Sequence, residues 1–301
     1  MSDPIAELEA LRRGDAVIVD RSDRGFVRVT GPDALSFLQA LVSADLDPLA
    51  DGDAVESLLL QPQGKLDVAF RLVRVAADDL WLDTDPGLAP QLVASLQRFK
   101  VRVDVTIEDR SDWWGMFTVV GADLTPAGDG PCRVVVSRVG FDVLGPTSGE
   151  CDMARERLLD SGAAIVTRDA WEAFRIERGF PVQPADVDDS TIPQEAELEL
   201  DAVSFTKGCF LGQELVCRID SRGHVNRFLR RLVAIDGERP VPGAEIVSDG
   251  KVVGAVTSVT PEPFAPVALG YVRREVEPPA TVDVRSPNGS ATARVELLRP
   301  V

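Results

Sequence analysis

The chain is poor in the residues that hold metals. It has one histidine, His224, and four cysteines, Cys132, Cys151, Cys209 and Cys217. No two cysteines form a C-x-x-C pair, so their spacing predicts no zinc ribbon, ferredoxin-type cluster or thioredoxin-like pair. A single imidazole excludes histidine-rich zinc and non-haem iron sites. Because no secretory signal is visible, we also expect no disulfide framework.

Motifs of common hydrolytic and nucleotide chemistry are also missing. The sequence contains no G-x-S-x-G and no P-loop of the form G-x-x-x-x-G-K-[ST]. Conventional hydrolase chemistry is therefore poorly supported. If the chain is an enzyme, carboxylates, a thiol or a bound organic cofactor must carry the reaction.

Basic residues are scarce for a chain of 301 residues. Thirty-two Lys and Arg stand against 49 Asp and Glu, a formal net charge of −17. Such a surface repels phosphate backbones, so we expect no stable nucleic-acid binding and no contact with anionic membranes. No apolar run approaches the roughly 18 residues of a membrane span. The first residues show no basic n-region and no apolar h-region. We expect a soluble, cytoplasmic protein.

The N-terminal third alternates strand and helix patterns. A helix is expected directly after Gly31 and Pro32, because Pro is favoured at the first helical position. The mixture predicts an α+β domain with helices on a mixed sheet. The predicted strands are residues 16–20, 26–30, 55–60, 66–75, 80–84 and 101–107, and a second helix is predicted over 86–100.

Two further domains are predicted after a boundary near residues 109–112. The second contains strands over 116–120 and 133–136, helices over 151–161 and 168–178, and an irregular acidic stretch. The adjacent Trp113 and Trp114 should face opposite ways, with one in the core. Short β-type runs between Gly and Pro turns then predict a small antiparallel barrel or sandwich. The predicted domains are 1–110, 111–222 and 223–301.

The densest group of chemically meaningful residues is the segment T-K-G-C-F-L-G-Q-E at 206–214. Gly208 and Gly212 allow the backbone to approach a ligand or another strand closely. Lys207 can lower the pKa of the Cys209 thiol. The alternative is a Gly-rich turn around a buried cysteine, since free cysteines are among the most buried residues.

This segment resembles the K-G-C-[YF]-x-G-Q-E signature of the YgfZ-type folate-binding proteins. These share a superfamily with the glycine-cleavage T-protein, an aminomethyltransferase. Phe210 stands where Tyr is commoner, which removes a hydroxyl and keeps a ring for stacking. Further likenesses lie at residues 175–181 (R-x-E-x-G-x-P), 192–195 (I-P-Q-E), 222–227 and near both ends, so the resemblance covers nearly the whole chain.

The resemblance implies three domains in a ring around a central pocket that holds tetrahydrofolate. It implies mixed sheets with helices, and a small C-terminal β-barrel. Cys209 and Lys207 are the implied catalytic residues. Glu177 would bind the pterin through two charge-assisted hydrogen bonds, although it could instead belong to a surface ion-pair cluster with Arg175 and Arg178. The other implied folate ligands are Gly208, Gly212, Gln213, Glu214, Arg222 and Arg227.

A basic run contrasts with the acidic remainder of the chain. Between Lys207 and Arg231 there are six bases and two acids. Such a run would suit an anionic ligand such as a folate glutamate tail. A solvated basic face is the alternative, and His224 within the run is expected to be a surface residue.

One segment departs from the T-protein pattern. The T-protein places an acidic pair after a Gly-Gly turn, whereas the matching residues 63–69 here read Q-G-K-L-D-V-A. Val68 and Ala69 occupy the acidic positions, and Asp67 comes one residue too early. In a strand, a slip of one residue turns a side chain to the other face. This argues against aminomethyl transfer, and Asp67 could be an ordinary solvated carboxylate.

Three functions are compatible with these patterns. We favour a tetrahydrofolate-binding protein that supports iron–sulfur cluster assembly or repair in client enzymes, with folate and iron–sulfur client or assembly proteins as partners. Cys209 would be its functional thiol, and any cluster contact would be shared, because one cysteine cannot hold a cluster alone. The alternatives are a folate-dependent aminomethyltransferase that uses Asp67, and a folate or RNA adapter without chemistry.

Overall fold

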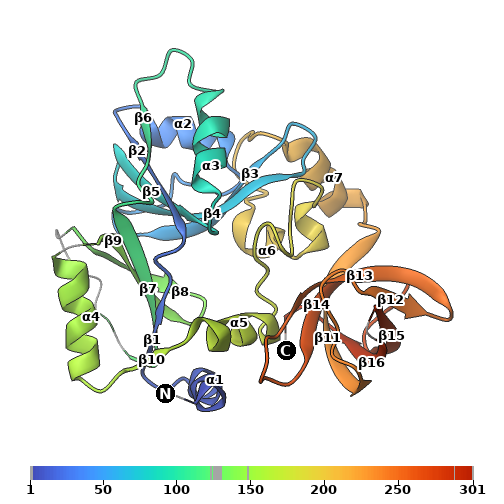
Figure 1. Ribbon diagram of the computed structural model, residues 1–301. Helices are drawn as coiled ribbons and strands as arrows, with labels where there is room; N and C mark the ends of the chain where they lie inside the picture. The colour runs from blue at the N-terminus through green and yellow to red at the C-terminus, as the bar shows by residue number, and fades with distance from the viewer. Residues whose placement is uncertain (1–2, 123, 125–130, 148, 288, 300–301) are drawn as a thin grey trace. The chain divides into compact units, whose positions relative to one another are not determined.

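The computed structural model describes residues 3–122, 124, 131–147, 149–287 and 289–299 (Figure 1). The chain divides into two compact units, each built from segments far apart in the sequence. The barrel unit comprises Met1–Glu9, Thr167–Leu198 and Leu215–Val301, and the two-sheet unit comprises Ala10–Val166 and Glu199–Glu214. The three-domain division remains a prediction.

The two-sheet unit contains an antiparallel sheet with the strand order β3-β4-β5-β2-β6. Helices α2 (Ala34–Leu41) and α3 (Ala89–Gln97) share a hydrophobic core with this sheet. Val68, Phe70 and Leu72 are alternate residues of β4, and so point to one face, where they join that core. The strands are β2 (Gly25–Thr30), β3 (Ala54–Leu60), β4 (Leu66–Ala76), β5 (Asp79–Thr84) and β6 (Thr106–Asp109).

The second sheet of this unit has the order β10-β1-β7-β9-β8, with β1 and β10 parallel. As predicted, the two adjacent tryptophans separate: Trp113 is 61% exposed, whereas Trp114 is buried with its ring 4.2 Å from that of Trp81. The elements are β1 (Val17–Asp20), β7 (Trp114–Val120), β8 (Arg133–Ser137), β9 (Gly140–Pro146), β10 (Ala164–Val166) and α4 (Glu150–Asp160). The short helix α6 (Glu199–Ala202) contacts β3 of the first sheet.

In the barrel unit, six antiparallel strands close in the order β11-β14-β13-β12-β15-β16 (orange to red in Figure 1). The predicted barrel is therefore confirmed. Helix α5 (Arg168–Glu177) packs against β13 and β14. The strands are β11 (Arg227–Gly237), β12 (Glu245–Ser248), β13 (Lys251–Val259), β14 (Val267–Arg273), β15 (Ala280–Ser286) and β16 (Gly289–Glu296); a 3-10 turn covers Pro193–Glu195.

Several elements differ from the sequence prediction. The predicted strand 101–107 pairs only from Thr106, because Arg102 has φ 57° and interrupts the extended backbone; Val101 is 69% exposed. The sequence prediction lacks strands β9 and β10 and helices α1 (Pro4–Arg13), α6 and α7 (Gln213–Arg222). No helix in the described part of the chain is long and apolar enough to cross a membrane.

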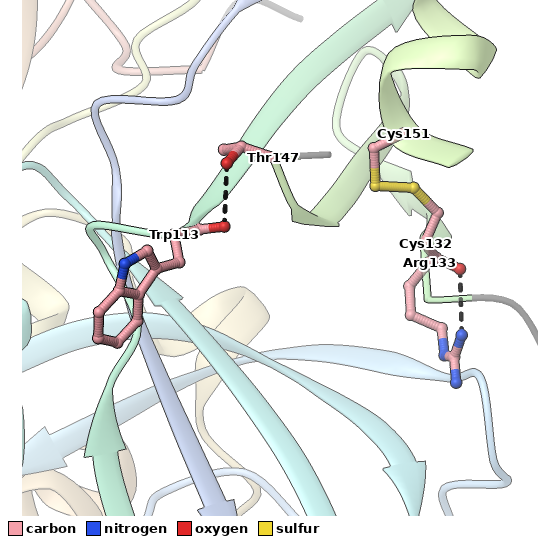
Figure 2. The surroundings of a disulfide bond; sticks show 5 residues. All are labelled: Trp113, Cys132, Arg133, Thr147 and Cys151. Carbon is pink, nitrogen blue, oxygen red and sulfur yellow. Dashed lines mark hydrogen bonds between the residues drawn. A yellow bond between two sulfur atoms is a disulfide. The ribbon is translucent and has the colours of Figure 1, made fainter. Parts of the chain in front are cut away.

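A disulfide joins Cys132 and Cys151, contrary to the expectation of unpaired cysteines (Figure 2). Cys132 directly precedes β8, and Cys151 lies in the first turn of α4. The chain reverses through the β8–β9 hairpin and brings the two Cα atoms to 5.5 Å, within the range for a disulfide. Sequence spacing gives no sign of this proximity.

Candidate functional site

The signature segment forms a loop between α6 and α7 in the two-sheet unit. Cys209 is exposed, whereas the next residue, Phe210, is buried. The loop is thus anchored by an apolar side chain and presents its thiol to solvent. The alternative of a buried cysteine is wrong.

Lys207 holds the start of the loop to the end of helix α2. Its Nζ donates hydrogen bonds to the carbonyl oxygens of Gln39 at 2.8 Å, Val42 at 2.8 Å and Ala44 at 2.7 Å. The last carbonyls of a helix lack partners within the helix and carry the negative end of its dipole. The ammonium group therefore closes the end of α2.

The surroundings of Lys207 also change its titration. Burial lowers the pKa of Lys207 to about 8, although Asp45 and Asp47 oppose this shift. The ammonium lies 5.8 Å from the centre of the Phe210 ring, a cation–π distance. Lys207 thus contacts both the helix end and the aromatic anchor of the loop.

Gly212 is packed against the turn that joins β3 and β4. Its φ is +75°, and a Cβ there would lie 2.3 Å from the carbonyl oxygen of Gln61 and 3.2 Å from the Cα of Gly64. A side chain at position 212 would collide with this backbone. The second glycine of the signature is therefore required by close backbone contact.

Gln213 and Glu214 begin helix α7. The Gln213 Oε1 accepts a hydrogen bond from the backbone N–H of Phe210 at 3.3 Å, which ties the loop to the helix start. Glu214 is exposed. Six of the predicted site residues therefore belong to one short, well-anchored structure.

Asp67 has a partner on helix α3. Gln91 Nε2 donates to the Asp67 Oδ1 at 2.8 Å and to its carbonyl oxygen at 3.2 Å. The side chain of Val68, at the position of the expected acidic pair, is completely buried in the core. The acidic position of the T-protein pattern thus has a packing role here.

Glu177 lies in the barrel unit, as the last residue of helix α5. It is half-buried, and its carbonyl oxygen accepts a hydrogen bond from Arg231 Nη1 at 2.8 Å. The neighbouring Arg175 is buried and pairs with Asp186 at 2.8 Å and with Glu172 at 2.5 Å. The guanidinium of Arg175 is therefore paired with the carboxylates of Asp186 and Glu172.

The basic run lies partly on α7 and partly on β11. Arg222 is exposed at the end of α7, and His224 is exposed as predicted. Arg227 donates from Nε and Nη2 to the two oxygens of Glu195 at 3.0 and 3.1 Å. Two further arginines of β11 have carboxylate partners: Arg230 with Glu197, and Arg231 with Glu296.

A hollow of about 500 Å³ lies on the outside of the barrel, between β13, β14 and residues 184–190. It contains Arg227, whose guanidinium stacks 4.2 Å from the centre of the Tyr271 ring, and also Arg273. Sequence reasoning missed Tyr271 and Arg273 as site residues, although their alternation along β14 places them on one face.

The predicted site residues thus form two groups. The loop residues of the two-sheet unit are Lys207, Gly208, Cys209, Gly212, Gln213 and Glu214, whereas Glu177, Arg222 and Arg227 belong to the barrel unit. Their roles in binding or catalysis remain predictions.

Two family models match the sequence. The GCVT N-terminal domain matches residues 2–124. The glycine cleavage T-protein C-terminal barrel domain matches residues 230–301, which include most of the closed barrel. Together the two models cover both ends of the chain.

Individual proteins extend the likeness over nearly the full length of the chain. The tRNA-modifying protein YgfZ of Cronobacter sakazakii is 26% identical over 98% of this chain and 96% of its own. An aminomethyltransferase of Nostoc is 29% identical over 98% of this chain and 86% of its own. In alignments with proteins of Haemophilus influenzae and Arabidopsis thaliana, the chain spans about two thirds of the relative's length.

One solved structure confirms the fold. The glycine cleavage system aminomethyltransferase T of Bartonella henselae superposes with a TM-score of 0.79 at 22% identity. The superposition covers 98% of this chain and 90% of that protein. Mixed sheets, helices and a C-terminal barrel are thus common to both.

Proposed function

Because this chain belongs to the glycine cleavage T-protein superfamily and resembles its YgfZ-type members, we propose that it binds tetrahydrofolate and supports iron–sulfur cluster assembly or repair in client enzymes. A shared fold supports several activities, so the function must be argued from the site.

The observation that carries the proposal is the exposure of Cys209 on an anchored loop. Lys207 ties the loop to the end of α2, and Gly212 packs on the β3–β4 turn. A thiolate is both a nucleophile and a ligand for iron. An accessible thiol on a fixed loop suits brief contact with a client protein that supplies the remaining cluster ligands.

The proposed folate ligand in the barrel unit is Glu177. Its carboxylate stands at the C-terminal residue of α5, where the helix dipole adds negative potential. This arrangement suits a ring system that presents N–H donors, as the pterin does. Tetrahydrofolate, when bound, supplies nitrogen atoms that carry one-carbon units. Glu177 would orient the ring by accepting its hydrogen bonds.

Aminomethyl transfer is the alternative, and relatives such as the Nostoc protein bear that name. It needs a carboxylate beside the folate nitrogens, and Asp67 is the candidate. The hydrogen bonds from Gln91 to Asp67 and the burial of Val68 speak against it. Folate turnover with an aminomethylated carrier protein would support this alternative over our proposal.

Other relatives are named as tRNA-modifying proteins, which raises an RNA adapter as the third possibility. A net charge of −17 opposes such binding. Salt-dependent binding of tRNA by the purified protein would favour the adapter.

The decisive test compares iron–sulfur enzyme activities in a deletion strain that carries wild type, C209S or C217S. Cys217 is a matched control, because it is the second free cysteine and is only half-exposed. We expect wild type and C217S to restore the activities and C209S to fail. Full restoration by C209S would remove the proposed role of the thiol.

Folate binding needs its own measurement. Calorimetric titration with tetrahydrofolate should show binding by wild type and at least tenfold weaker binding by E177Q, since a charged hydrogen-bond acceptor contributes about 1.5–3 kcal/mol. E262Q is the control, because Glu262 is an exposed acid of the same unit. Equal affinities for all three proteins would exclude Glu177 as the pterin ligand.

A further inference from the structure

Two arginines face each other across neighbouring barrel strands. Arg227 of β11 and Arg273 of β14 are direct partners in the antiparallel register, and both line the hollow outside the barrel. Like charges directly opposite each other in a sheet destabilise it. A negative charge close to both arginines would offset this repulsion.

The neighbouring carboxylates neutralise the two arginines only in part. Glu195 accepts from Nε and Nη2 of Arg227, but Nη1 has no hydrogen-bond partner in the described part of the chain. Arg273 lies 3.8 Å from Glu275, and both side chains are at least 60% exposed. An exposed ion pair of this length contributes little. Donors therefore remain available on both guanidinium groups.

The two acids in the hollow are held by other donors. Asp186 accepts from Arg175 Nη1 at 2.8 Å and from Thr257 Oγ1 at 2.5 Å. Asp188 Oδ1 accepts from the backbone N–H and the hydroxyl of Ser190, at 2.9 and 2.6 Å. Neither acid accepts a hydrogen bond from the two arginines, although Asp188 and Arg227 are close enough for their charges to attract.

The shape of the hollow suits a small organic molecule. Its volume of about 500 Å³ lies within the usual range of ligand pockets. The half-buried Tyr271 ring stacks on the Arg227 guanidinium, and Glu195 orients the same group through two hydrogen bonds. Val252 and Ala255 add apolar wall. An oriented guanidinium beside an apolar wall is suited to an oxyanion with an organic body.

We propose that this hollow binds the oxyanion end of a small organic ligand, with Arg227 and Arg273 as its donors. Carboxylate and phosphate both match the paired N–H groups of a guanidinium. Only the identity of the ligand rests on the proposed function: in a folate-binding protein, the glutamate carboxylates of the folate are the oxyanions concerned.

The test uses the full chain and probes that lack the pterin. Calorimetry would measure p-aminobenzoyl-triglutamate, as a carboxylate probe, and inorganic phosphate. Arg273→Gln is the variant of choice, because Arg273 is exposed and its loss leaves no buried partner. Arg285→Gln is the matched control, an exposed arginine of β15 that does not line the hollow.

We expect wild type and R285Q to bind the glutamate probe alike and R273Q to bind at least tenfold more weakly. Binding of phosphate alone, with the same dependence on Arg273, would also support the site and identify a phosphate ligand. Binding of neither probe, or equal loss in both variants, would overturn the proposal. A chain that binds the probe but not tetrahydrofolate would contradict the proposed function and leave this site standing.

Discussion

Gly212 and Gln61 touch through their backbones: a Cβ on Gly212 would lie 2.3 Å from the Gln61 carbonyl oxygen. Gly212 belongs to the cysteine loop, and Gln61 begins the turn between β3 and β4. The contact therefore couples the thiol-bearing loop to the hairpin in which the T-protein pattern places its acidic pair. It also explains why the signature contains a glycine at this position.

Replacement of Gly212 by Ala should displace the loop. The φ of +75° alone costs a residue with a Cβ about 1–2 kcal/mol, and the collision with Gln61 adds to this. We expect faster amide hydrogen exchange over residues 204–212 and a lower melting temperature.

Gly208 is the matched control, since a Cβ there would meet no atom within 4 Å. G208A should exchange and melt like wild type. Equal effects of the two substitutions would show that the contact with Gln61 does not hold the loop.

Lys207→Met should loosen the join between the loop and α2. The variant loses three hydrogen bonds from the ammonium to carbonyl oxygens, and we expect a loss of about 1–3 kcal/mol in the free energy of unfolding. Urea unfolding would measure the loss. K207R keeps a charged donor, so its free energy of unfolding should fall less than that of K207M. Equal losses in the two variants would show that these hydrogen bonds do not stabilise the fold.

The stability contributed by Lys207 should depend on pH. Burial lowers its pKa to about 8 in the folded chain, against about 10.4 when unfolded. Between these values the unfolded chain binds more protons at this residue, so the free energy of unfolding rises with pH. Relative to K207M, wild type should gain stability from pH 8 to pH 10. A constant difference would contradict the lowered pKa.

The two free thiols should react at different rates. Cys209 is exposed, whereas Cys217 is only half-exposed and its pKa is raised by burial and by Asp220. Because the thiolate is the reacting form, iodoacetamide should modify Cys209 first. Peptide mass spectrometry of wild type and C209S would establish the order. Faster modification of Cys217 would show that the loop shields its cysteine.

Local patterns predicted most of the architecture. Alternating apolar residues located most strands of both units, and the Gly and Pro turns predicted the barrel. The alternating apolar pattern predicts a strand wrongly at residues 101–105, because strand formation depends on pairing with a neighbouring strand as well as on apolar content. The signature residues of the loop were recognised, but the use of Lys207 was not, because the carbonyls of α2 come from a segment about 165 residues away.

The basic run between Lys207 and Arg231 also shows that contacts between distant segments cannot be predicted from local sequence. Sequence reasoning read the basic run as available for an anionic ligand. The structure pairs much of it with acids from elsewhere: Glu195 holds Arg227, Glu197 holds Arg230, and Glu296 holds Arg231. Only the strand register identifies Arg227 and Arg273 as neighbours.

A buried charge network in the two-sheet unit should govern its response to acid. Arg71 donates to Asp83 at 2.9 Å and to Asp142 at 2.5 Å, and Arg24 donates to Asp83 at 2.7 Å. Burial alone would raise the pKa of Asp83, but Arg71 and Arg24 more than offset it and hold that pKa below its ordinary value. Asp83 therefore stabilises the fold above about pH 4, and this contribution is lost as the pH falls through its folded pKa.

Asp83→Asn should test this network. It removes the buried carboxylate that Arg71 and Arg24 share and leaves Arg71 only Asp142 and Arg24 only Asp85, so we expect a loss of about 3–5 kcal/mol at pH 7 that shrinks towards pH 3. D51N is the control, because Asp51 is 60% exposed in its ion pair with Arg74 and should cost under about 1 kcal/mol. Urea unfolding followed by tryptophan fluorescence would report on this unit through Trp81 and Trp114, which lie in its core. If D83N fails to fold at pH 7, the acid midpoints of wild type and D51N still check the assignment. The two proteins should unfold at nearly the same pH, since both retain Asp83. A large shift in D51N would place the acid-sensitive group at the exposed pair of Asp51 and Arg74.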